Sequence, residues 1–186
     1  MANEYKAGEG VTFKYDSDTG SVEFYSDGGT LWPDCIKKAG ISRKDVQSIR
    51  VAEGTVKLPE DASGFDKQKM VYTMFGGLVN VESIDLKGTD TSRVTNMFAM
   101  FFDCVHLKEL DISSFDTSNV TNMIQMFLNC CSLKELDMSS FDISNVKDIS
   151  GIFTNCERLT RVRMTPTISG DAATYNIFRN CSADII

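Results

Sequence analysis

The chain has 186 residues, of which 42% are hydrophobic and 24% are charged, and its formal net charge is −7. This length and apolar content suit one domain with a buried core. The acidic balance and the scattered basic residues argue against a nucleic-acid binder, and no apolar run approaches the roughly 20 residues that a membrane-spanning helix needs.

The first 45 residues predict a hairpin followed by a short helix. Residues 11–15 and 22–25 alternate apolar and polar side chains, and turn-forming residues separate them at 16–20, which indicates a β-hairpin. Residues 33–39 predict a helix, because Pro33 suits its first position and Gly40 its end. We expect residues 1–45 to cap the repeat array that follows at residues 46–186.

Internal repeats occupy the rest of the chain. Segments that begin at Val81, Leu107, Leu133 and Leu159 share the pattern LxxLxL in steps of 26 residues. The pattern is the strand signature of leucine-rich repeats, whose units have roughly 20–29 residues. An earlier copy begins at Val46, 35 residues before Val81, so the first unit contains an insertion around residues 58–64. We expect about five stacked units with one continuous core.

A second apolar stripe recurs within each unit. Met97, Met100 and Phe101 are followed one period later by the matching residues at 123, 126 and 127, and then at 149, 152 and 153. Offsets of three and four residues place such side chains on one helical face. The stripe therefore predicts short helices at 95–103, 121–129 and 147–155, and a terminal helix near 175–178. The fold class is α/β, with a parallel sheet on one side of a solenoid and short helices opposite.

The repeat resembles a known family. Its unit reads Leu-Lys-Glu-Leu-Asp-Ile/Met-Ser-Ser-Phe-Asp-x-Ser-Asn-Val and continues with Met-x-x-Met-Phe-x-Asn-Cys. This unit is similar to the BspA-type leucine-rich repeat of bacterial surface proteins, and the resemblance covers about residues 46–181. It implies a right-handed solenoid and a non-enzymatic role in adhesion or protein binding at the bacterial surface.

Four of the six cysteines follow the repeat, at Cys104, Cys130, Cys156 and Cys181. Neighbouring units lie about 4.8 Å apart, a spacing that would permit disulfides. Stacked parallel side chains rarely have the required geometry, so we expect buried free thiols that pack as small hydrophobic groups. The cysteine spacing and the single histidine give no metal-ligand pattern, and no metal or cofactor is expected.

The outward positions of LxxLxL form two columns of charge. Eight residues in them are the predicted partner-binding residues: Arg50, Asp85, Glu109, Asp111, Glu135, Asp137, Arg161 and Arg163. A carboxylate strip with arginines at both ends favours a basic partner segment or Ca²⁺. It is also compatible with aspartates that only accept hydrogen bonds from nearby loops. The arginine end could meet an acidic partner or only keep an edge strand soluble.

No catalytic pattern accompanies this face. His106 is the only histidine, so any serine or cysteine nucleophile would depend on it. GxSxG, P-loop, HExxH and GxGxxG motifs are absent from the sequence, and we expect no enzymatic activity. The repeated Asn129, Asn155 and Asn180 are expected to bond the loop before each strand.

The sequence thus predicts a protein-binding or adhesion module whose partner is another protein, such as a host or extracellular-matrix protein. We expect the cell surface or secretion if an export signal has been removed ahead of Met1. The alternative is a cytoplasmic scaffold or regulatory adaptor, which six cysteines in a reducing compartment would suit. A metal-dependent structural module, and weak self-association through the C-terminal end of the solenoid, are further alternatives.

Overall fold

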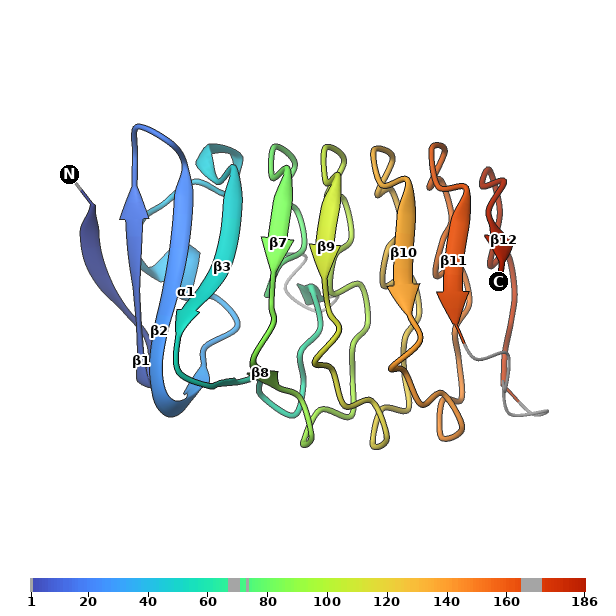
Figure 1. Cartoon of the computed structure of the whole chain (residues 1–186), viewed down its shortest axis with the longest axis horizontal. Coiled ribbons are helices and arrows are strands. Elements are labelled where there is room, and N and C mark those ends of the chain that lie inside the picture. Colours follow the sequence, from blue (N-terminus) through green and yellow to red (C-terminus); the bar gives the residue numbers. More distant parts are fainter. Residues whose placement is uncertain (1, 67–70, 73, 165–171) are drawn as a thin grey trace.

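The computed structural model describes residues 2–66, 71–72, 74–164 and 172–186. One short parallel strand from each coil lies beside the next along the molecule (Figure 1). The strands are β3 (Ser48–Glu53), β7 (Ser83–Asp85), β9 (Glu109–Asp111), β10 (Glu135–Met138), β11 (Arg161–Met164) and β12 (Asp184–Ile185). The predicted parallel-sheet solenoid is confirmed, with about six coils rather than five because β12 adds one.

The N-terminal hairpin is present and continues the sheet. Strands β1 (Asn3–Asp16) and β2 (Ser21–Leu31) are antiparallel, with Phe13 opposite Phe24. The turn between them closes where the Gly20 N–H donates to the Asp16 carbonyl oxygen at 2.8 Å, with φ of +67° at Gly20. The predicted helix is present as the shorter α1 (Cys35–Lys38), which begins after Asp34, so Pro33 precedes the helix and is not its first residue. A 3-10 turn, η1 (Arg43–Asp45), follows it. Strand β2 then pairs in parallel with β3, so the hairpin and the first coil share one sheet.

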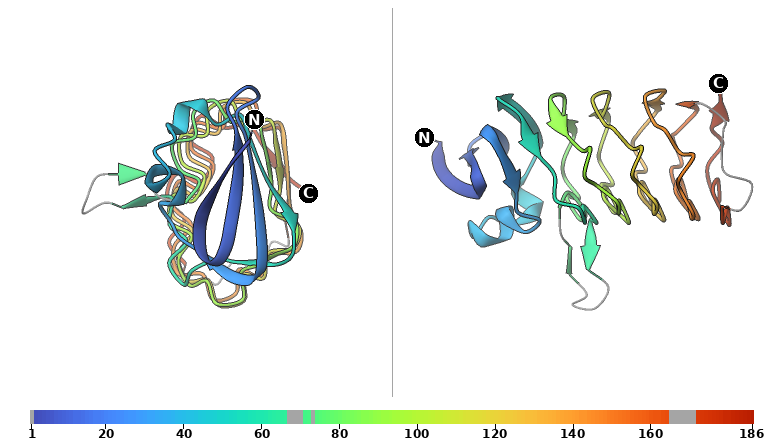
Figure 2. Two further views of the ribbon diagram at one scale, coloured as in Figure 1. Left: turned by 90° about the vertical axis from the view of Figure 1, so that its left-hand side faces the viewer. Right: turned by 90° about the horizontal axis from the view of Figure 1, so that it is seen from below.

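Short strands also form beside and outside the main row. Strands β4 (Val56–Lys57) and β8 (Thr89–Asp90) extend the sheet from the far end of β2. The long first unit holds a second hairpin, β5 (Phe65–Asp66) with β6 (Val71–Tyr72), which projects from the side of the stack (Figure 2). This hairpin accounts for much of the extra length of that unit. The predicted position of the insertion, around residues 58–64, is therefore wrong, because the N–H groups of Ala62 and Gly64 bond positions 96 and 98 of the next coil.

Opposite the main strands, the structure has turns where the sequence predicts helices. The N–H groups of Met97, Ala99, Phe101 and Asp103 donate to carbonyl oxygens at positions 122, 124, 126 and 128, at 2.9–3.0 Å. In an α-helix these N–H groups would bond four residues back in their own coil. Left-handed φ values of +52° at Ala99 and +59° at Asp103 break such a helix. The terminal segment at 175–180 is likewise a turn. The predicted helices at 95–103, 121–129, 147–155 and 175–178 are therefore wrong, and these segments are turns whose N–H groups bond the neighbouring coil where one follows.

The predicted core stripe is nevertheless buried. Met97, Met100 and Phe101 and their copies in the next two coils are at most 3% exposed. One aromatic ring per coil stacks on the next, with centroid separations of 5.8, 5.6, 5.7 and 5.5 Å along Phe75, Phe101, Phe127, Phe153 and Phe178. The repeat therefore places identical rings directly above one another, as the 26-residue period implies.

Beside these rings, the cysteines are free thiols. The Sγ atoms of Cys104, Cys130 and Cys156 donate to the carbonyl oxygens of Phe75, Phe101 and Phe127 at 3.2, 3.3 and 3.1 Å. Burial raises the pKa of Cys104 and Cys156 to about 12, and that of Cys130 well above its usual value. Cys181, in the last coil, is half-buried. The predicted column of free, packed thiols is confirmed.

Candidate partner-binding face

The sheet face, meaning the outward side of β3, β7, β9, β10 and β11, carries all eight predicted partner-binding residues. Arg50 lies opposite Asp85, and Asp85 opposite Asp111, in neighbouring strands. On the other side of the face, Asp137 lies opposite Arg163, and Glu135 opposite Arg161. The alternation of LxxLxL thus places these side chains outward while the apolar positions enter the core.

The arginines at the two ends are already paired. Arg50 donates through Nε to Glu23 at 2.8 Å, and the Tyr25 hydroxyl donates to the same carboxylate at 2.7 Å. Arg161 bonds Glu135, and Arg163 bonds Asp137 at 3.2 Å. Hydrogen bonds from Tyr25 and Arg50 lower the pKa of Glu23. Four of the eight predicted residues therefore neutralise one another, and Arg50 is neutralised by a residue outside the prediction.

Glu23 was missed because it precedes the repeat. The alternation of residues 22–25 predicts that its side chain points outward. It does not predict that β2 pairs in parallel with β3, which places Glu23 opposite Arg50. No local sequence signal gives that pairing.

Three carboxylates remain in the middle of the face: Asp85, Glu109 and Asp111. Within the described ranges none of them forms an ion pair. Asp85 accepts from the Lys87 N–H at 3.0 Å, and Asp111 accepts from the N–H and hydroxyl of Ser113 at 3.0 and 2.6 Å. The bonds from Ser113 lower the pKa of Asp111, so this group is ionised at neutral pH.

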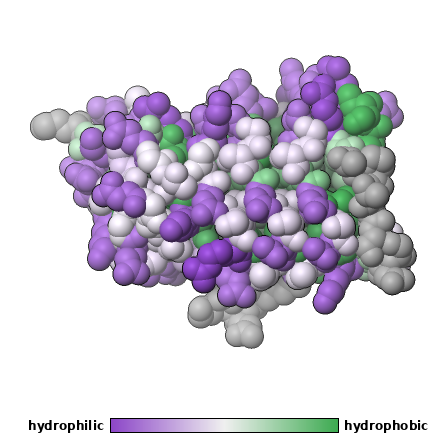
Figure 3. Space-filling view, turned by 60° about the horizontal axis from the view of Figure 1, so that its bottom comes forward, coloured by the Kyte–Doolittle hydropathy of each residue, from purple (hydrophilic) through white to green (hydrophobic). Residues whose placement is uncertain are grey.

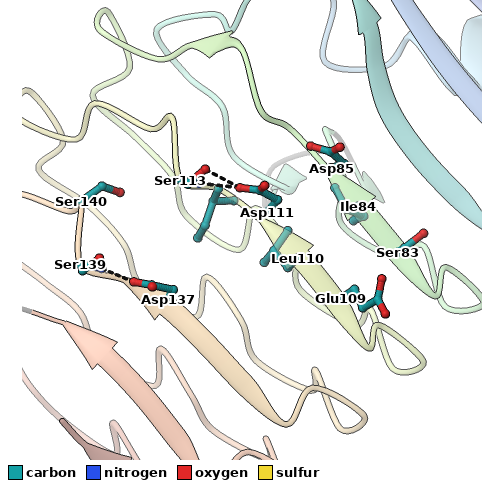
Figure 4. Close-up of a pocket in the computed structure, with 11 residues that line it drawn as sticks. Ser83, Ile84, Asp85, Glu109, Leu110, Asp111, Ser113, Asp137, Ser139 and Ser140 are labelled. Carbon is teal, nitrogen blue, oxygen red and sulfur yellow. Dashed lines mark hydrogen bonds between the residues drawn. The ribbon is translucent and has the colours of Figure 1, made fainter.

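A hollow of about 540 Å³ opens over these carboxylates, between the ends of β7, β9 and β10. Figure 4 shows Asp85, Asp111 and Asp137 aligned along it, each at or next to the end of its strand. The side chain of Leu110 lies at its floor and is half-buried, whereas the equivalent Ile84 and Leu136 are 1% and 4% exposed. The core-facing side chain of β9 is therefore accessible from the sheet face, whereas those of the flanking strands β7 and β10 are covered.

The described residues give little support for a catalytic site, a metal site or a membrane-spanning helix. The ring of the exposed His106 donates through Nδ1 to the Val79 carbonyl oxygen at 2.7 Å. Among the residues that the structure describes, no group of three or more His, Cys, Asp or Glu side chains could hold a metal ion. In the same residues, no helix has the length and apolar character needed to cross a membrane.

The far end of the solenoid has exposed apolar side chains. Figure 3 shows hydrophobic side chains gathered toward the C-terminal end and mostly hydrophilic ones over the loops. Ile185 and Ile186 belong to this end and are 44% and 58% exposed.

Residues 69–184 match the family described as "Mycoplasma protein of unknown function, DUF285". The chain belongs to the DUF285 family. The DUF285 part contains β7, β9, β10 and β11 and hence the three unpaired carboxylates. No curated protein matches the sequence.

Two solved structures are similar to this DUF285 chain. The leucine-rich repeat protein of T. pallidum is 19% identical, with 81% of this chain and 67% of that chain covered and a TM-score of 0.27. A leucine-rich repeat protein from Eubacterium ventriosum is 15% identical, with 89% of this chain covered and a TM-score of 0.27. The DUF285 chain spans 45% of the length of the Eubacterium protein.

Proposed function

We propose that this DUF285 chain is a non-enzymatic module that binds another protein on its sheet face. The observation that carries the proposal is the hollow over β7, β9 and β10, in which Asp85, Glu109 and Asp111 are held without ion-pair partners among the described residues. Elsewhere on the face, arginines compensate the carboxylates. A local excess of negative charge on an otherwise compensated surface suits a partner of opposite charge.

Two further observations favour binding over catalysis. His106 is exposed and bonds the Val79 carbonyl oxygen through Nδ1, and among the described residues no serine, threonine or cysteine is hydrogen-bonded to its ring. The thiols of Cys104, Cys130 and Cys156 are buried with raised pKa values, whereas a nucleophilic cysteine needs an accessible thiolate.

We propose a location at the cell surface or in the secreted fraction, with a host or matrix protein as partner, on the strength of the BspA-type repeat. The second candidate is a cytoplasmic adaptor, which the six free cysteines favour. Protease treatment of intact source cells separates them. Cleavage while a cytosolic control protein survives supports the surface location, and survival until lysis supports the adaptor.

The binding role is tested by capture with a matched pair of variants. The face variant is Asp85→Asn, Glu109→Gln and Asp111→Asn, and the control is Glu9→Gln, Glu60→Gln and Glu157→Gln, with the same change in net charge at exposed positions elsewhere. We expect any specific partner to be lost with the face variant and retained with the control. Equal capture by both would remove the sheet face from the proposal.

We also propose that the N-terminal hairpin caps the first coil, and that the last coil supports weak self-association. Val22 and Phe24 of β2 are buried against the first coil, which supports the cap. The exposed Ile185 and Ile186 support the self-association. Light scattering over a range of concentrations tests it, and a constant monomer mass would contradict it.

A further inference from the structure

The parallel sheet is interrupted between β9 and β10. Hydrogen-bonded pairing runs from β2 to β9 and again from β10 to β12, but β9 and β10 are not paired. The same two coils are bonded on the opposite side, where the N–H groups of Met123, Gln125 and Phe127 donate to the carbonyl oxygens of positions 148, 150 and 152 at 3.0 Å. The coils are therefore joined along one side and open along the strand side.

The interruption leaves main-chain groups without partners among the described residues. The Glu109 N–H donates to the Glu82 carbonyl at 3.2 Å, and the Asp111 carbonyl accepts from Leu86 at 3.0 Å, so these two residues use their main chain toward β7. Because neighbouring residues of a parallel strand bond to opposite sides, the N–H and C=O of Leu110 face β10.

The equivalent residue two coils later forms the backbone hydrogen bond that Leu110 lacks. Val162 occupies the position of Leu110 two coils later, and its carbonyl oxygen accepts from the Ile186 N–H of the next strand at 3.0 Å. Leu110 has no such bond to β10. An open strand edge of this kind is a template for an added extended segment.

The charge around the open edge selects the kind of segment. Asp85, Glu109 and Asp111 line the hollow and have no ion-pair partner in the described ranges, while Glu135 and Asp137 on the β10 side carry arginines. In an extended segment alternate side chains point to the same side. Basic side chains at alternate positions would therefore meet the carboxylates while the main chain follows the edge.

We propose that the break between β9 and β10 is a docking groove for an extended, basic segment of the partner protein. Its main chain bonds to the N–H and C=O of Leu110, and its lysine or arginine side chains contact Asp85, Glu109 and Asp111. The half-buried Leu110 side chain is covered by the bound segment. This inference rests on the proposed function and names the chemistry of the partner.

The first test uses a synthetic peptide of about nine residues, a usual strand length, in which lysine and threonine alternate. Titration calorimetry compares the wild-type chain, the face variant and the charge-matched control variant. We expect the face variant to bind about tenfold more weakly and the control to bind like wild type, with salt weakening all three. A peptide with glutamate in place of lysine should not bind. Equal binding of the two peptides, or equal loss in the two variants, would overturn the charge assignment.

The second test is amide hydrogen exchange, which reports the main-chain contact independently of charge. In the free protein we expect the Leu110 amide to exchange faster than that of its equivalent, Val162, and to slow when the lysine–threonine peptide binds. The same peptide with N-methyl groups at alternate residues should bind more weakly. A slow Leu110 amide in the free protein, or one unchanged by bound peptide, would show that the edge is not a docking site.

Different results would contradict the docking groove and the partner-binding function. If the face variant loses a natural partner but the basic peptide neither binds nor protects Leu110, the groove inference is wrong and the binding module stands. If the peptide result holds but every natural partner is retained by the face variant, the groove exists and the proposed function is wrong. Ca²⁺ is a separate outcome of the same calorimetry. Saturable binding of Ca²⁺ that excludes the peptide would replace the peptide inference with a cation site.

Discussion

Asn155 donates its side-chain amide to the side-chain oxygen of Asn129 over 2.8 Å, and both residues have left-handed φ values, +59° and +64°. Asn180 bonds Asn155 in the same way at 2.8 Å, and Asn129 bonds Asp103 at 2.6 Å. The sequence predicts that these asparagines bond the loop before each strand, whereas the structure has them bond one another. The ladder thus joins neighbouring coils at the positions where each turn reverses direction.

Replacement of Asn129 should separate the ladder from the backbone strain. Asn129→Gly loses the ladder bonds but accepts the left-handed φ, and Asn129→Ala loses the bonds and adds strain of about 1–2 kcal/mol. We therefore expect the alanine variant to be the less stable of the two in urea denaturation. At Asn119, which donates to the Ser92 carbonyl at 2.8 Å without a left-handed φ, glycine should be no better than alanine. The reverse order at 129 would show that the left-handed backbone imposes no penalty on a residue with a Cβ atom there.

The thiols should react in an order set by burial. At pH 8 we expect iodoacetamide to modify Cys131 and then Cys181, both half-buried. Cys104, Cys130 and Cys156 should react only after denaturation, because burial raises their pKa values and excludes the reagent. Mass spectrometry of peptides taken at successive times gives the order. Early modification of Cys130 in the folded protein would contradict the packed column.

Removal of a central ring should destabilise the solenoid more than removal of the last ring. Phe127 is stacked on both sides at 5.6 and 5.7 Å and is fully buried, so Phe127→Ala should lower the free energy of unfolding by about 3–5 kcal/mol. Phe178 stacks on one side only and is half-buried, so Phe178→Ala should cost less. Chemical denaturation measures both, and equal losses would argue against a continuous stack.

Stability should fall in acid. Hydrogen bonds from Ser92 and Ser113 lower the folded-state pKa values of Asp90 and Asp111 below the ordinary value of 3.8. The stabilisation is present above that ordinary value and is lost as the pH falls through the lower folded-state value, so the free energy of unfolding should decline below about pH 4. Asp90→Asn keeps an acceptor for Ser92 but does not titrate. Its decline between pH 5 and pH 2 should therefore be shallower than that of wild type, and identical curves would contradict the assignment.

Release of the carboxylates at β10 should strengthen peptide binding. Arg161→Gln and Arg163→Gln together free Glu135 and Asp137, which extends the negative charge along the groove. We expect the lysine–threonine peptide to bind several-fold more tightly, with a change in protein stability within about 1 kcal/mol because both ion pairs are exposed. Arg158→Gln with Arg179→Gln is the control, since both are exposed and alter the net charge equally. Equal tightening in the control would trace the effect to overall charge.

The strands and core were predictable because the signal is repeated. Leu107, Leu133 and Leu159 are fully buried, as LxxLxL requires, and the outward columns lie in the order expected from their 26-residue spacing. Apolar periodicity constrains which side chains enter the core. It does not distinguish a helix from a turn of similar spacing, and here Ala99 and Gln125 adopt left-handed φ values of +52° and +56°. Neither residue type signals that conformation.

The open groove had no sequence signal. Residues 107–112 and 133–138 differ only in their last position, Ile112 against Met138, yet β9 is unpaired toward β10 while β10 is paired with β11. Whether two strands pair therefore depends on how neighbouring coils pack against each other, and not on the sequence of either strand alone. The pairing of Arg50 with Glu23 likewise depends on a parallel contact between segments 27 residues apart, which no local pattern encodes.

The cross-coil hydrogen bonds determine which changes in length the solenoid can accept without losing its register. The Met97 N–H reaches position 122 and the Met123 N–H reaches position 148, so each coil bonds to the next in the same register. Gain or loss of one whole unit would leave every remaining coil with an equivalent neighbour, and would change the sheet face by one strand spacing of about 4.8 Å. Any other insertion must loop out, as β5 and β6 do. The width of the sheet face in this chain therefore depends on its number of units, because an added unit would repeat the contacts that its neighbours already make.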